Sequence, residues 1–305
     1  MGPRHSMSMP SLFTHLMIAQ DARTQLKSPG LQALIEQHQT AYFLGALAPD
    51  LPYFDIFHSY RGLPLGTFLS PLSHTVEERV MAWMGWNMPR YDGWAHELHS
   101  ANTQNIIKTW ARHADKRHPA FLALVAGMAT HVAADETLHP KINADSGDQD
   151  TAEGMQAHRS LEINLDFVLL RTRGFAIEGL SQAGLMELYL GRPGRQGDFL
   201  SPGQKAAWVE TSRACDLSPI SRADLERWSQ GFAGAMRWLD HRFSPVEQQR
   251  RVFLKGGEQQ WRTFFARERY LSTHVPLASQ TAALWMDRLL AEPVPGLIWE
   301  DFAGV

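Results

Sequence analysis

The stretch that most restricts the fold of this chain is residues 119–139, where several independent signals all favour a helix. Pro119 suits the first position of a helix, because the backbone N–H that it lacks would have no intrahelical partner there. The interior is rich in alanine and leucine, which are strong helix formers. Pro140 follows directly, and the residue before a proline is pushed out of the helical region. The pattern therefore predicts a helix over 119–139 that ends before Pro140.

The rest of the chain carries similar helical signals and no persistent alternation of period two. Further helices are expected over residues 11–27, 31–47, 75–84, 95–112, 155–171, 203–214, 221–240, 244–269 and 277–291. Ser221 with Asp224 predicts a capping box, and Gly256-Gly257 is expected to break its helix. Loops are expected over residues 50–73, 83–94 and 143–154. We therefore interpret the chain as an all-α protein.

Composition excludes several classes of protein. The 32 acidic and 29 basic residues give a formal net charge of −3, which disfavours stable binding of duplex nucleic acid. The single cysteine, Cys215, excludes an internal disulfide framework and a cysteine-based zinc finger. No run of 18 apolar residues is present, so no transmembrane segment is expected. Residues 1–8 are expected to be a leader outside the fold without the features of a secretory signal, and the expected location is therefore cytoplasmic. The amino-acid sequence does not indicate an oligomeric state.

Histidines are concentrated in the first half of the chain, with 12 of the 14 in the first 158 residues. His131 and Asp135 are four residues apart in the predicted helix and share a face, so both can bind one ion. An ideal helix turns about 100° per residue, so each step of four drifts by about 40°. His139 therefore lies to the side of His131, and we expect it to serve a neighbouring ion.

A second pair with the same spacing, His158 and Glu162, lies on the helix predicted over 155–171. Two helices that each offer a histidine and a carboxylate are typical of metal sites inside helix bundles. Nitrogen and oxygen ligands without thiolate suit zinc, iron or manganese. One such pair is commonly a surface ion pair, but two pairs with a third histidine indicate metal binding.

Other candidates leave alternatives open. His15 lies between apolar neighbours and is either a ligand or a buried histidine bonded to a backbone carbonyl. Asp50 is either a ligand or a turn residue. His99 stands near the start of a predicted helix, and His96 is the alternative in the same segment. His74 is interpreted as half of a surface ion pair.

Five segments, taken in order, resemble the zinc-dependent phospholipase C family. They are THLMIAQDA at 14–22, FLGALAPDLPYFD at 43–55, LHSANT at 98–103, AFLALVAGMATHVAADETLHP at 120–140 and AHRSLEINLD at 157–166. The resemblance covers residues 11–170 and implies a multi-helix fold shared with the S1/P1-type nucleases, built around a cluster of zinc ions. The short spacing between Asp135 and His139 is similar to that of the amino-terminal domain of glycosylphosphatidylinositol-specific phospholipase D.

The resemblance also implies a set of ligands for each ion. One zinc would be held by Asp50, His99, His131 and Asp135. A second would be held by His139, His158 and Glu162, and a third by His15 with Asp135 as a bridge. Secreted members complete the third site with the amine of an N-terminal tryptophan, whereas no tryptophan precedes Trp83 here. Two to three zinc ions are therefore expected, in a catalytic domain over 9–174 with a C-terminal helical extension, 175–305, packed on it.

The function implied by the resemblance is a phosphoesterase that cleaves a phosphodiester in a phospholipid head group or a nucleotide. Clustered zinc ions lower the pKa of a bound water and polarise the phosphoryl oxygen, and Asp50 is expected to accept the proton. The alternative is a non-catalytic helical protein that keeps the family's metal site for binding. Several aromatic residues are candidate walls for a lipid or a base, with core packing as the favoured alternative; they are Phe54, Phe57, Trp83, Trp86 and Trp94.

Overall fold

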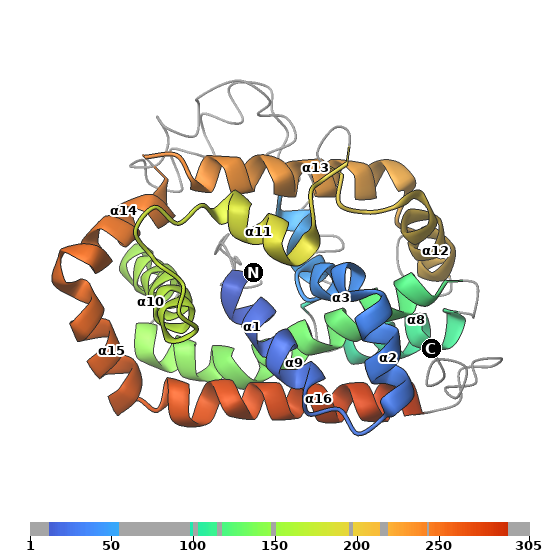
Figure 1. Ribbon diagram of the computed structural model, residues 1–305, viewed down its shortest axis with the longest axis horizontal. Coiled ribbons are helices and arrows are strands. Elements are labelled where there is room, and N and C mark those ends of the chain that lie inside the picture. Colours follow the sequence, from blue (N-terminus) through green and yellow to red (C-terminus); the bar gives the residue numbers. More distant parts are fainter. Residues whose placement is uncertain are drawn as a thin grey trace.

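The computed structural model describes residues 12–54, 98–99, 103–114, 118–147, 151–194, 198–213, 219–242 and 244–291. Within these ranges every regular element is a helix (Figure 1), so the predicted all-α class is confirmed. The α-helices are α1 (Leu12–Arg23), α2 (Pro29–Gln37), α3 (Gln39–Gly45), α8 (Thr103–His113), α9 (Pro119–Ser146), α10 (Ala152–Thr172), α11 (Gln182–Leu190), α12 (Pro202–Ser212), α13 (Arg222–Leu239), α14 (Pro245–Val252), α15 (Glu258–Arg267) and α16 (Val275–Ala291). Three shorter segments are the 3-10 segment η1 (Ala48–Phe54) and the π-helical turns η3 (Phe253–Gly257) and η4 (Tyr270–His274).

The long helix α9 forms the centre of the bundle. Every residue from Phe121 to Ala134 is buried, because α9 is covered on several sides. Helices α3 and α16 pack along it, and Figure 1 shows α16 running beside α9. A helix that is apolar all round its axis belongs in a core and not on a surface. The polar residues on this part of α9, among them His131, are therefore held inside the protein.

The crossing of α3 over α9 depends on two glycines. A Cβ atom on Gly45 would overlap the carbonyl oxygen of Leu124, and one on Gly127 would overlap that of Tyr42. Without side chains at these positions the two backbones approach closely. This approach brings Ala46, at the end of α3, next to the polar residues of α9.

Helix α1 also lies inside the bundle, where it packs against α9, α10 and α16 (Figure 1). Nine of its twelve residues are buried, His15 among them. With the exception of Ala233, the buried apolar residues of the described chain form one cluster that extends from Leu12 to Met286. The proposed division into 9–174 and 175–305 stays a prediction.

The predicted end of the central helix before Pro140 is wrong, because α9 continues past this residue. Proline removes one intrahelical hydrogen bond, and packing from outside offsets that loss. Lys141 lies 2.6 Å from Asp145 and 2.8 Å from Glu268 of the α15–η4 region, so the last turns of α9 are fastened to another part of the fold. The start of the loop predicted over 143–154 is wrong for the same reason.

Two further differences lie in α2, α3 and α11. The helix predicted over 31–47 is broken at His38, whose φ of −122° and ψ of 39° are not helical. Neither glycine nor proline marks this break, so the local sequence gave no signal for it. Helix α11 was not predicted, although Ser181 caps it by accepting a hydrogen bond from the N–H of Gly184 at 2.9 Å.

Two local predictions are confirmed in the C-terminal part. Ser221 and Asp224 form the capping box at the start of α13. The long helix predicted over 244–269 is broken between α14 and α15, where Gly256 has a φ of 127°. This left-handed region strongly favours glycine.

Several predictions concern residues outside the described ranges: the leader 1–8, the loop beyond Phe54, the helix over 75–84 and the loop over 83–94. Among the helices that the structure describes, none combines the length and the apolar character needed to cross a membrane.

Candidate metal centre

Side chains from five separate segments converge beside α9. They are His15 of α1, Asp50 of η1, His99, then His131, Asp135 and His139 of α9, and finally His158 and Glu162 of α10. These are the eight residues singled out as candidate ligands in the sequence. In each of three groups the possible ligand atoms lie within 4.8 Å of one another; the groups are His15–Asp50–His131 and His99–His131–Asp135, which share His131, and His139–His158–Glu162.

Four residues surround the first position where an ion fits. The Nε2 atoms of His99 and His131 are 3.3 Å apart, and His99 Nε2 lies 3.1 Å from Asp50 Oδ1. His131 Nε2 lies 3.1 Å from Asp135 Oδ2 and 3.8 Å from Asp50 Oδ1. Zinc with nitrogen and oxygen ligands at 2.0–2.1 Å separates neighbouring tetrahedral ligands by about 3.3 Å. The spacing of these atoms therefore fits one small cation.

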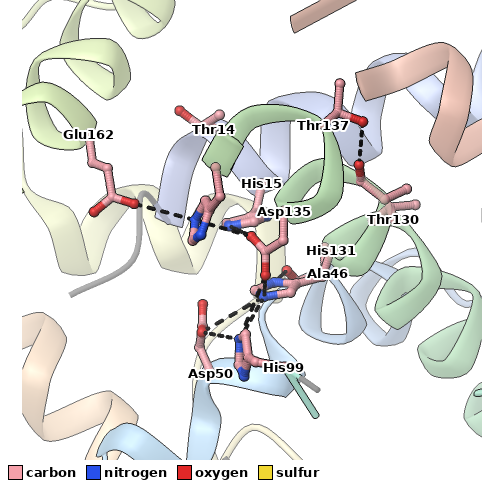
Figure 2. A network of polar contacts seen from close by, with 12 residues as sticks. Thr14, His15, Ala46, Asp50, His99, Thr130, His131, Asp135, Thr137 and Glu162 are labelled. Atoms are coloured by element: carbon pink, nitrogen blue, oxygen red, sulfur yellow. Dashed lines mark hydrogen bonds and ion pairs between the residues drawn. The ribbon is translucent and has the colours of Figure 1, made fainter. Parts of the chain in front are cut away.

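Asp135 stands between the groups (Figure 2). Its Oδ2 faces His131 at 3.1 Å and His99 at 3.7 Å. Its Oδ1 faces two other histidines, His15 at 3.4 Å and His139 at 3.5 Å. A carboxylate whose two oxygens face different sets of nitrogens has the geometry of a bridge between two ions.

The second position lies between α9 and α10. Glu162 Oε1 is 3.2 Å from His158 Nε2 and 3.6 Å from His139 Nε2. The two imidazole rings are perpendicular, with their centroids 5.7 Å apart. His139 therefore lies with the α10 pair and not with His99. These three residues offer two nitrogens and one carboxylate, a set that suits zinc.

His15 lies in a buried part of the cluster. Its ring stacks on that of His131, with centroids 4.0 Å apart and planes 11° from parallel. Its Nδ1 is buried and has no hydrogen-bond partner among the described residues. A buried histidine bonded to a backbone carbonyl, the alternative left open by the sequence, is therefore not what the structure contains at this position. His15 has its possible ligand atom close to those of Asp50 and His131.

The backbone fixes the orientation of His131. Its Nδ1–H donates a hydrogen bond of 2.8 Å to the carbonyl oxygen of Ala46, which the close crossing of α3 and α9 brings there. Nε2 is thereby turned toward His99 and Asp135. Metal-binding histidines typically donate their second ring N–H in this way, which sets the tautomer and the direction of the lone pair.

The charges of the cluster are strongly coupled. Burial, and then the neighbouring His131, lower the pKa of His15 to about 3. Burial opposes a charge on His131, but Asp135 and Asp50 outweigh it and raise the pKa to about 9. Burial also opposes ionisation of Asp135, yet His131 and other nearby histidines hold its pKa well below the usual range. His15 is therefore a neutral nitrogen donor and Asp135 an anion at neutral pH.

Exposure distinguishes a closed end of the cluster from an open one. The closed end consists of His15, Asp50 and His131, which are at most 4% exposed; His158 and Glu162 of α10 are also buried, at 5% and 1%. The side chains of His139, His99 and Asp135 are 37%, 22% and 17% exposed. These three residues form the exposed edge of the cluster.

The donor set and the burial together fit metal ions. Asp50 Oδ2 and Glu162 Oε2 are buried without a hydrogen-bond partner in the part of the chain that the structure describes. A buried polar atom left in this state costs about 1–3 kcal/mol, and an unpaired carboxylate costs more. Coordination of divalent cations would satisfy these oxygens and neutralise the carboxylates. The arrangement therefore has a physical reason to bind metal ions.

Zinc affinity is expected to rise by at least about tenfold per pH unit between pH 6 and pH 8. In the protein without metal, the pKa of His131 is raised to about 9, so its Nε2 carries a proton below that pH. Because an entering ion must displace this proton, binding strengthens as pH rises toward 9. His15, with its pKa lowered to about 3, adds nothing to this slope. Competition with a chelator of known pH dependence measures it, and an affinity that is constant between pH 6 and pH 8 would contradict the assigned charge states.

The structure adds Tyr53, which the sequence reasoning missed. Its ring centroid lies 5.4 Å from that of His99, and burial, followed by Asp50 and Asp135, raises the pKa of its hydroxyl. Its position three residues after Asp50 was the available signal. Phe54, by contrast, is 1% exposed and packs against Phe232, so its role is core packing, the favoured alternative. The other suggested aromatic walls, and also His74 and His96, lie outside the described residues.

Comparison with known proteins gives one family. The model of a family described as zinc-dependent phospholipase C matches residues 14–229. This match includes all eight candidate ligands and extends beyond residue 170, where the resemblance noted in the sequence ended. No curated protein and no solved structure gave a significant match.

Proposed function

Because this chain belongs to the zinc-dependent phospholipase C family, we propose that it is a zinc-dependent phosphodiesterase that releases the phosphorylated head group of a phospholipid. The observation that carries the proposal is the position of Asp135, with each carboxylate oxygen facing different histidines beside an exposed edge. A metal site that serves structure alone is closed by its ligands, whereas a catalytic site keeps a position open. The exposed edge at His99, Asp135 and His139 supports the catalytic alternative.

The ligands divide between ions as follows in this proposal. Asp50, His99, His131 and Asp135 would hold one zinc, and His139, His158 and Glu162 would hold a second. His15 and the shared Asp135 would hold a third. In this proposal Asp50 would bind the first zinc through Oδ1, which leaves Oδ2, without a hydrogen-bond partner among the described residues, for proton transfer.

Zinc ions bound at these groups would lower the pKa of a water molecule and polarise a phosphoryl oxygen. Asp50 is the proposed proton acceptor for that water, through a carboxylate oxygen that carries no other hydrogen bond in the described structure. Tyr53 keeps its hydroxyl proton at neutral pH, since burial and the two nearby aspartates raise its pKa. Its hydroxyl is the proposed donor to a phosphate oxygen of the substrate.

Hydrolysis by the zinc-loaded protein tests this function. The substrates are a short-chain phosphatidylcholine, p-nitrophenyl phosphocholine and single-stranded DNA, each assayed beside the Asp50→Asn variant. The expected result is release of diacylglycerol and phosphocholine by the wild type, with a loss of at least about a hundredfold in Asp50→Asn, typical of removing a general base. Cleavage of single-stranded DNA alone would show that the substrate is a nucleic acid and not a phospholipid. No cleavage of any phosphodiester by fully loaded protein would favour the non-catalytic metal-binding alternative.

A further inference from the structure

Asp166 of α10 fastens the first turn of α1. Its Oδ1 accepts hydrogen bonds of 2.7 Å from both the backbone N–H and the hydroxyl of Thr14. Its Oδ2 accepts a longer one, of 3.4 Å, from the N–H of Phe13. The first N–H groups of a helix have no intrahelical acceptor, and a carboxylate also interacts favourably with this positive end of the helix. The residue is only 8% exposed, so water competes little for these bonds.

This contact bears directly on the cluster, because Thr14 is followed by His15. The ring of His15 is held by stacking on His131, and its Nδ1 has no hydrogen-bond partner in the described part of the chain. No hydrogen bond to the backbone therefore fixes this ring, in contrast to that of His131. The position of the His15 side chain therefore depends on the position of the first turn of α1, which Asp166 holds.

Helix α10 also carries one of the ligand groups. Glu162 lies four residues before Asp166, and His158 lies four residues before Glu162. Residues at this spacing follow one another along one side of a helix. One helix thus supplies ligands at one end of the cluster and holds the backbone of the ligand at the other end.

We propose that Asp166 is a positioning residue that sets the location of His15 and thereby the affinity of the ion at the closed end. The inference rests on the proposed function, because it concerns an ion of the same cluster. Asp166 itself does not belong to any of the three ligand groups. Partners that orient metal ligands from behind typically change metal affinity by ten- to a hundredfold when they are mutated.

The chain contains a second carboxylate that accepts hydrogen bonds at a helix N-terminus, and this contact serves as a matched control. Asp240 holds the start of α11 by accepting from the N–H of Gln182 at 2.5 Å and from the hydroxyl of Ser181 at 2.8 Å. This is the same arrangement of one carboxylate with a helix N-terminus and a hydroxyl. Helix α11 contributes no residue to the ligand groups, so the contact of Asp240 holds a helix that carries no ligand.

The test is zinc retention by the full chain during titration with a chelator, followed by elemental analysis. Asp166→Asn is expected to lower the affinity for one zinc ion by about tenfold and to leave the affinity for the others unchanged. Hydrolysis by this variant should fall at low zinc and recover in excess zinc. Thr14→Val should lower the affinity for the same ion. Thr14→Ser, which keeps the hydroxyl, should bind zinc like the wild type. Asp240→Asn should lower thermal stability without changing zinc retention.

A double-mutant cycle separates positioning from general support of the fold. If Asp166 acts through His15, Asp166→Asn should cause no further loss of zinc in a His15→Ala background. Wild-type zinc affinity in Asp166→Asn, or an equal weakening of all ions, would overturn the positioning role while leaving the proposed function in place. A wild-type protein that binds no zinc would overturn both.

Discussion

Replacing Asp135 with asparagine is expected to remove two metal ions and to lower phosphodiester hydrolysis by about a thousandfold or more. The carboxylate has one oxygen 3.1 Å from His131 and the other 3.4 Å from His15 and 3.5 Å from His139. An amide of the same size keeps one weak oxygen ligand and presents an NH₂ group to the other side. It therefore cannot bridge two cations.

Glu162→Gln is the comparison, since this carboxylate faces only His139 and His158. Elemental analysis after dialysis should show that Glu162→Gln loses one zinc ion per chain and that Asp135→Asn loses two. The double variant His241→Gln/His274→Gln serves as a control that should keep all its zinc, because neither histidine belongs to a ligand group. Equal losses from Asp135→Asn and Glu162→Gln would argue against the bridge.

His15→Ala is expected to remove one ion and at least about 99% of the activity, while the fold and the remaining ions persist. Without the imidazole, only Asp50 and the shared Asp135 remain near that position, and zinc normally needs three protein ligands to be held firmly. Inorganic phosphate should raise the occupancy of this ion in the wild type, because a phosphate oxygen can fill a position that the protein leaves open.

Loss of a buried ring also leaves a cavity, which costs about 2–5 kcal/mol for a large-to-small change in a core. His15→Gln, which fills more of this space, is therefore assayed in parallel, with circular dichroism as the check on folding. Both variants should lose the same ion. Full activity in a folded His15→Gln protein that lacks this ion would show that the closed end of the cluster does not take part in catalysis.

The most predictable features of the sequence were those set by helical spacing. His131 with Asp135, and His158 with Glu162, share faces of α9 and α10 because four residues make little more than one turn. The angular drift placed His139 away from His131, and in the structure it lies beside Glu162. Local chemistry also predicted the capping box of α13 and the break at Gly256.

What the sequence did not reveal depends on contacts between distant segments. The continuation of α9 past Pro140 is supported by Lys141 and its partner Glu268, 127 residues further along the chain. The role of Asp166 depends on its contact with Thr14, which is 152 residues away. No periodicity or capping rule relates such pairs, because tertiary packing alone brings them together.

The zinc content of the purified wild-type chain is the most direct test of the proposed metal centre. The protein is purified without chelator, dialysed against zinc-free buffer and analysed for metals per chain, beside the variant Asp135→Asn/Glu162→Gln. The convergence of eight ligand residues with separations suited to tetrahedral coordination predicts at least two zinc ions in the wild type. The double variant should retain less than one. A wild-type protein that holds less than one transition-metal ion per chain would contradict the account.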